Sequence, residues 1–137
     1  MRIFILSVIL IAVFSCSSSK NTKSSLIELN GTWLPIKQEM GGKALPAAFF
    51  EKQKLVINKK MYSVFAESVD KGELVINNGK IDIYGKEGVN AGKHFTALYQ
   101  TSNGQLSICY NLSGDSYPES LETKTNPKLF LSVYKKE

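Results

Sequence analysis

Two Asn-Gly pairs, each lying between two short β-rich runs, constrain the fold of this chain more than any other feature of its sequence. The pairs are Asn78-Gly79 and Asn103-Gly104. Both residues of such a pair tolerate positive φ, so each pair favours a two-residue hairpin turn. The sequence therefore predicts two antiparallel hairpins, formed by residues 72–77 with 80–84 and by residues 94–101 with 105–111.

Four further β-rich runs bring the number of candidate strands to eight: residues 32–40, 54–58, 61–66 and 129–135. Apolar residues alternate with polar ones in several of them, which is typical of a sheet with one buried face. Eight antiparallel strands can close into a barrel with no free edge. We therefore expect an all-β fold, an antiparallel barrel of about eight strands, with one short helix at residues 46–53 after the first strand. A sandwich remains the alternative, because the pattern alone does not show closure.

The start of the chain has a different character. Arg2 precedes twelve mostly apolar residues, Ile3 to Phe14, which match a secretory signal and are too few to span a bilayer. Val13-Phe14-Ser15-Cys16 then resembles the lipobox of bacterial lipoproteins, with the bulky Phe14 as a departure. The alternative is an ordinary secretory signal with an incidental cysteine.

The lipobox resemblance implies that Cys16 becomes the lipidated N-terminus. It divides the chain into a signal peptide (1–15), a lipidated cysteine with a Ser-rich tether (16–27) and a folded domain (28–137). The expected location is the bacterial cell envelope, with the membrane as a partner through the lipid. Ser17 is not the aspartate that retains some lipoproteins at the inner membrane, which favours the outer membrane.

Charge and composition exclude several kinds of partner. The formal net charge of +5 falls to +4 on cleavage, because the signal peptide contains Arg2 and no acid. The lysines of the folded part are scattered, whereas nucleic-acid binding needs a clustered basic footprint. One His and two Cys leave no spacing typical of a metal site. We therefore expect neither nucleic acid nor a metal or other cofactor.

Local motifs give no catalytic assignment. The run Gly88 to His94 is one residue short of a phosphate-binding loop and lacks its hydroxyl residue. His94 is the only imidazole, and a surface or rim position is the favoured interpretation. Cys109 lies in a β pattern without an evident base, which indicates an inert buried thiol. An enzyme is thus the third-ranked class of function.

Gly31-Thr32-Trp33, at the entry to the first strand, resembles the Gly-x-Trp hallmark of calycins, the group that includes lipocalins. In those barrels the Trp closes one end and a basic residue from the last strand covers its ring. The resemblance implies this structural role for Gly31, Trp33 and a terminal lysine, Lys135 (or Lys136).

A longer match is with a small lipocalin-like family of bacterial secreted proteins first grouped from planctomycete sequences. It covers about residues 28–136, and Tyr117 and Leu121 replace its usual Arg and Phe. No established activity of that family can be transferred. The matching segments are Gly31-Thr32-Trp33, Gly42 to Pro46, Leu55 to Ile57, Tyr62 to Val64, Lys71 to Leu74, Ile81 to Ile83, Gly92-Lys93, Ala97 to Tyr99 and Leu106 to Tyr110.

Strand aromatics are the best candidates for a binding role, because aromatic side chains commonly line small-molecule pockets. We expect a non-enzymatic protein that binds a small hydrophobic or amphipathic molecule in the mouth of the barrel. The alternative is a protein–protein interaction module with a solid barrel, contacting its partner through residues 85–93 and 112–127. The oligomeric state stays open. The candidate lining residues are Tyr62, Phe95, Tyr99, Tyr110 and Phe130.

Overall fold

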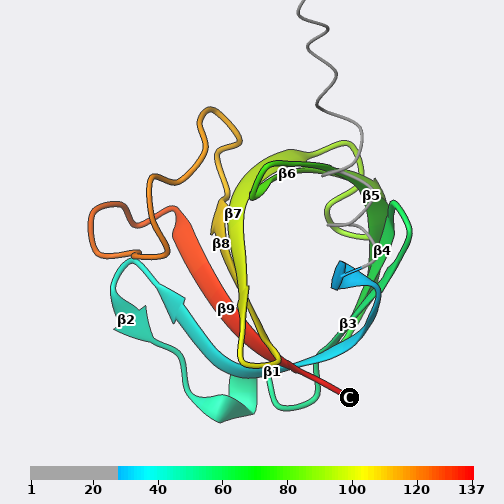
Figure 1. Cartoon of the computed structure of the whole chain (residues 1–137), viewed down its shortest axis with the longest axis horizontal. Helices are drawn as coiled ribbons and strands as arrows, with labels where there is room; N and C mark the ends of the chain where they lie inside the picture. Colours follow the sequence, from blue (N-terminus) through cyan, green and yellow to red (C-terminus); the bar gives the residue numbers. More distant parts are fainter. Residues whose placement is uncertain (1–27) are drawn as a thin grey trace, which may run out of the picture.

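The computed structural model describes residues 28–137, which form one nine-stranded antiparallel sheet closed on itself (Figure 1). Neighbouring strands follow one another around the barrel, and the last strand, β9, pairs with the first, β1. The strands are β1 (Gly31–Met40), β2 (Lys43–Ala44), β3 (Lys54–Asn58), β4 (Met61–Phe65), β5 (Val69–Asn77), β6 (Lys80–Glu87), β7 (His94–Ser102), β8 (Gln105–Asn111) and β9 (Leu129–Lys136).

Closure depends on β1, which serves two neighbours. Its first residues pair with β3, and Trp33 to Met40 pair with β9, with an irregularity in register between Pro35 and Lys37. The predicted all-β barrel is thus confirmed: eight strands close it, and the two-residue β2 is an extra strand on β1. In Figure 1, β2 lies outside the ring of strands.

Both predicted hairpins are present, and the Asn-Gly pairs form their turns. Asn78 and Asn103 have φ values of 50° and 51°, and Gly79 and Gly104 have 80° and 73°. These are the left-handed values that Asn and Gly tolerate best at the centre of a tight hairpin.

The prediction of a short helix at residues 46–53 is wrong. A single 3₁₀ turn, η1 (Ala47–Phe49), occupies this segment. An isolated helix of so few residues is unstable, because its first turn fixes several dihedrals for one hydrogen bond. Here the Gln53 Nε2 donates to the Phe49 carbonyl at 2.8 Å, which satisfies a group that a longer helix would have bonded internally.

Two clusters of apolar side chains pack on opposite sides of the barrel wall. The larger fills the interior and includes Trp33, Ile81 and Leu106. The smaller lies outside strands β8 and β9, where residues 112–128 (orange in Figure 1) run over Cys109 and Leu131. The closed sheet and both clusters lie within residues 28–137.

The two ends of the barrel differ. One end, the closed end, has the tight turns at residues 59–60, 78–79 and 103–104 and the entry of the chain at Glu28. The other end, which we call the mouth, has the longer connections, at residues 41–53, 66–68, 88–93 and 112–128.

Candidate functional site

Trp33 plugs the closed end of the barrel. Its indole is 4% exposed, and its Nε1 donates to the Leu29 carbonyl at 2.9 Å. The Lys136 Nζ lies 5.2 Å from the ring centroid, a favourable cation–π distance. At Gly31 (φ +138°), a Cβ would lie 2.7 Å from the Lys136 Cε, so the glycine leaves room for this lysine.

The choice of Lys135 as the covering residue is therefore wrong. Lys136 pairs directly with Trp33, whereas Lys135 pairs with Leu34. Paired residues share a face of the sheet and successive residues alternate between faces. Lys135 thus belongs to the outer face, and only Lys136 lies on the side of the indole.

The interior of the barrel is nearly full. The cavity between its strands measures about 50 Å³, whereas a small-molecule pocket measures roughly 300 Å³ or more. A ligand of drug size does not fit there without movement of the walls. The cavity is lined by Leu55, Ile57, Tyr62, Val64, Leu74, Ile81, Ile83, Ile108 and Tyr110.

Of the five aromatic residues predicted to line a cavity, only Tyr62 and Tyr110 do so. Phe95 and Tyr99 pack against the interior core as partly buried side chains. Phe130 stacks on Tyr110, with ring centroids 5.7 Å apart. Most of these aromatic side chains therefore pack against other side chains and do not line a cavity.

Tyrosine hydroxyls supply the polar atoms of this interior. The hydroxyls of Tyr110 and Tyr134 lie 3.2 Å apart, and burial is the main cause that raises the pKa of both. Burial, followed by the charge of Asp70, also raises the pKa of Tyr62. All three phenols are therefore neutral at physiological pH, and the interior carries no tyrosinate charge.

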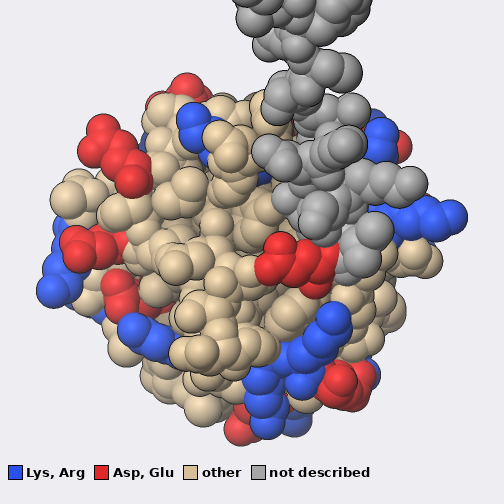
Figure 2. All heavy atoms as spheres, viewed as in Figure 1, with Lys and Arg blue, Asp and Glu red and all other residues tan. Residues whose placement is uncertain are grey.

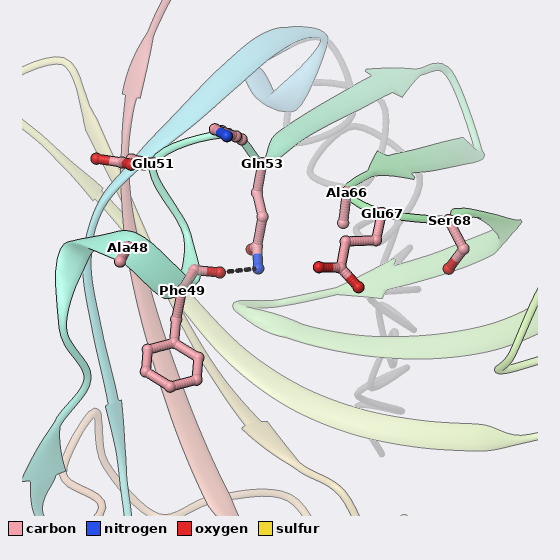
Figure 3. A pocket seen from close by; sticks show the side chains of 8 residues that line it. Ala48, Phe49, Glu51, Gln53, Ala66, Glu67 and Ser68 are labelled. Atoms are coloured by element: carbon pink, nitrogen blue, oxygen red, sulfur yellow. Dashed lines mark hydrogen bonds between the residues drawn. The ribbon is translucent and has the colours of Figure 1, made fainter.

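An open hollow of about 960 Å³ lies at the mouth, between η1 and the β4–β5 turn (Figure 3). In Figure 3 the Gln53 amide and the Glu67 carboxylate extend into this space from opposite sides. Phe49, beside them, is 68% exposed. The hollow is lined by Ala48, Phe49, Glu51, Lys52, Gln53, Ala66, Glu67 and Ser68.

Gln53 ties the hollow to the barrel. It donates to the Phe49 carbonyl, and its Oε1 accepts from the Gln38 Nε2 at 3.0 Å. Gln38 is 4% exposed and also donates to the Ser132 hydroxyl at 3.3 Å inside the barrel. Gln53 and Ala66 lie two residues from Leu55 and Val64, which line the interior cavity. Because side chains alternate along a strand, the hollow continues the inward faces of β3 and β4.

A glycine-rich connection, residues 88–93, folds over the neighbouring part of the mouth. The Asn90 N–H donates to the Asp70 Oδ1 at 3.0 Å, and the Gly92 N–H donates to the Gly85 carbonyl. A Cβ on Gly85 would lie 1.9 Å from the Asn90 oxygen, so only glycine permits this approach. These contacts make the segment a fixed part of the rim.

His94, the only imidazole, lies on the outer wall. Its Nε2 is 2.7 Å from the Asp82 Oδ1, and its ring stacks on Tyr84 at 4.7 Å. The Tyr117 hydroxyl donates to the other oxygen of Asp82, which is the main cause that raises the pKa of Tyr117 to about 12. The Lys80 Nζ lies 5.0 Å from the Tyr117 ring. This cluster fastens the long β8–β9 connection to the barrel wall.

No sequence pattern indicates that contact, because no spacing relates Asp82 to Tyr117. The residues of the mouth hollow were also missed, since they come from two connections without a shared motif. The one available signal was the apolar pair Phe49-Phe50, three residues after Pro46 in a connection that begins with Gly41-Gly42.

Cys109 is fully buried beneath the β8–β9 connection. Burial, and then the charge of Glu39, raises the pKa of its thiol to about 11. A thiol with so high a pKa is a poor nucleophile at neutral pH. Within residues 28–137, no three His, Cys, Asp or Glu side chains are grouped to hold a metal ion.

Charge is dispersed on the face of the molecule seen in Figure 2, where acidic and basic side chains are interspersed around the circumference. Cys16 lies outside the described residues. None of the helical segments in the described part has the length and apolar character of a membrane span.

Comparisons with known proteins identify no relative. No family model matches the chain, and neither the curated proteins nor the solved structures include a significant match.

Proposed function

We propose that this protein is a non-enzymatic binding module, lipid-anchored through Cys16 in the bacterial cell envelope, that holds an amphipathic molecule at the mouth of a lipocalin-like barrel. The observation that carries this proposal is the open hollow of about 960 Å³ beside an interior cavity of only about 50 Å³. The ligand thus stays at the barrel mouth, where the sequence suggested it, but in this hollow and not in a cavity lined by the strand aromatics.

The chemistry of the hollow supports an amphipathic ligand. Phe49 offers an apolar surface, and Gln53, Glu67 and Ser68 offer hydrogen-bonding groups within the same space. Small-molecule sites commonly combine an apolar wall with a few polar groups that orient the ligand. The His94–Asp82 pair lies on the outer wall, away from these residues, which favours binding over catalysis.

The lipocalin-like character of the barrel is supported by its closed end. There the indole of Trp33 lies beneath the ammonium of Lys136, as the resemblance to calycins implied. This likeness concerns architecture, and a shared architecture does not by itself indicate a function.

Calorimetric titration of residues 24–137 with a lysophospholipid and with a medium-chain fatty acid tests the proposal. We expect Ala66→Trp, which places an indole in the hollow, to weaken binding at least about tenfold, since it displaces the ligand's apolar part. The matched control is Val75→Trp, on the outer wall and 53% exposed. Equal affinities for the two variants would contradict binding at the mouth.

The nearly filled interior also favours a second candidate, a solid interaction module that binds a protein and no small molecule. Native mass spectrometry of the domain purified from its own cells distinguishes the two. The second candidate is preferred if no small molecule copurifies and no amphiphile gives heat in the titration.

Lipid attachment has its own test in metabolic labelling with a palmitate analogue. Cys16→Ser should abolish the label, and Cys109→Ala should retain it because Cys109 is buried inside the folded domain. A labelled Cys16→Ser variant would refute the anchor.

A further inference from the structure

Exposed apolar side chains are concentrated at one end of this barrel. Of the ten large hydrophobic residues that are exposed in the described part, six lie at the mouth or on its rim. One lies at the closed end and three lie on the outer wall. The six are Met40, Phe49, Phe65, Val69, Val89 and Leu112, and the other four are Met61, Val75, Ile36 and Tyr84.

The two most exposed of them project from separate connections. Phe49, in η1, is 68% exposed, and Val89, in the β6–β7 connection, is 67% exposed. Both connections are held in place, η1 by Gln53 and the β6–β7 connection by Asp70. The side chains are therefore presented to solvent by fixed backbone, and not as part of a loose loop.

We infer that the mouth rests on a lipid bilayer surface, with this apolar rim inserted among the head groups. A protein partner needs a continuous surface of about 800 Å² that packs closely against its own. Here Phe49 lines, and Phe65 and Val69 flank, an open hollow of about 960 Å³ that a flat protein would leave unfilled. Lipid head groups and chains adapt to such a shape, and an amphipathic ligand could then enter the hollow from the bilayer.

The charges of the rim suit such a surface. Exposed Lys43, Lys52 and Lys93 lie on the same connections, and their long stems can follow apolar surface while their ammonium groups stay in water. Glu51 and Glu67 offset most of this charge, and the β8–β9 connection adds two exposed lysines, Lys124 and Lys128, and three exposed acids, Asp115, Glu119 and Glu122, so the charges of the mouth connections sum to zero. We therefore expect apolar contact to dominate, with binding to neutral and anionic bilayers alike and little dependence on salt.

The chain before Glu28 is long enough for this orientation, a step that rests on the proposed lipid anchor. The 11 residues between Cys16 and Glu28 can span up to about 37 Å when extended. The ten residues of β1, tilted as in other barrels, rise about 25 Å along the axis. Although the chain enters the barrel at the closed end, a lipid on Cys16 can therefore reach the bilayer on which the mouth rests.

Vesicle flotation of residues 24–137 tests the inference. We expect the domain to float with phosphatidylcholine vesicles and with mixed phosphatidylethanolamine–phosphatidylglycerol vesicles. The double variant Phe49→Ser/Val89→Ser should lower partition about tenfold or more, because two large apolar side chains no longer leave water. The matched control Met61→Ser/Val75→Ser removes two exposed apolar side chains away from the mouth and should stay within about twofold of the unchanged domain.

Three results would overturn the inference: no flotation of the unchanged domain, an equal loss in the control pair, or flotation only on anionic vesicles that high salt abolishes. The lysophospholipid titration distinguishes a failure of bilayer contact from a failure of the proposed function. A domain that binds the soluble amphiphile but no vesicle would refute bilayer contact and leave ligand binding at the mouth intact.

Discussion

Ile108→Ala measures how tightly the barrel interior is filled. Ile108 is 3% exposed and lines the interior cavity of about 50 Å³. The substitution removes three buried carbons, each worth about 0.8 kcal/mol of transfer free energy. The new void, of the order of 60 Å³, adds about 1.4 kcal/mol at roughly 24 cal/mol per Å³. We therefore expect the free energy of unfolding to fall by about 4 kcal/mol.

Urea unfolding of residues 24–137, followed by the fluorescence of Trp33, gives this free energy. Xenon should stabilise the Ile108→Ala variant but not the unchanged domain, since an enlarged apolar cavity stays dry and accepts small apolar guests. Val75→Ala, on the outer wall, is the control and should change stability by no more than about 0.5 kcal/mol. A loss below about 1.5 kcal/mol for Ile108→Ala would show that the interior is loosely filled, and would refute the argument that ligands are kept at the mouth.

Three further predictions concern the closed end, the rim and the outer wall. Lys136→Ala should lower the free energy of unfolding by about 0.5–1 kcal/mol through loss of the cation–π contact, and Lys135→Ala should leave it unchanged in the same urea assay. Gly85→Ala should speed amide hydrogen exchange in residues 88–93, because the new methyl group displaces that segment; unaltered exchange there would contradict the close approach. Tyr117 should titrate at about 12 by NMR and move toward 10 in Asp82→Asn. Because the folded-state pKa is raised, the stabilisation from this contact is present below about pH 10 and lost as the pH rises through about 12.

The strands were predictable because their signals are local. Asn78-Gly79 and Asn103-Gly104 specify tight turns through backbone conformations that few other residues adopt. Strands β3 and β8 have the predicted limits, the other six predicted strands differ by one to three residues at an end, and the two-residue β2 was not predicted. Closure was the favoured expectation, but it depends on pairing between β1 and β9, which are far apart in sequence.

The features that could not be predicted share a physical cause: each depends on contacts between residues far apart in the sequence. Lys136 and Lys135 are equivalent in sequence, and only the register of β9 against β1 decides between them. Residues 112–128 show no apolar periodicity, yet they cover Cys109 and bring Tyr117 to Asp82. The mouth hollow likewise forms where two separate connections face each other.

The central claim is that this protein binds an amphipathic molecule at the mouth of a filled barrel. Amide chemical-shift mapping of residues 24–137 during titration with a lysophospholipid tests it most directly. The predicted result is a set of shifts confined to residues 47–53, 66–68 and 88–93. Shifts centred on the interior positions around Tyr62 and Ile108, or no shifts at saturating amphiphile, would contradict it.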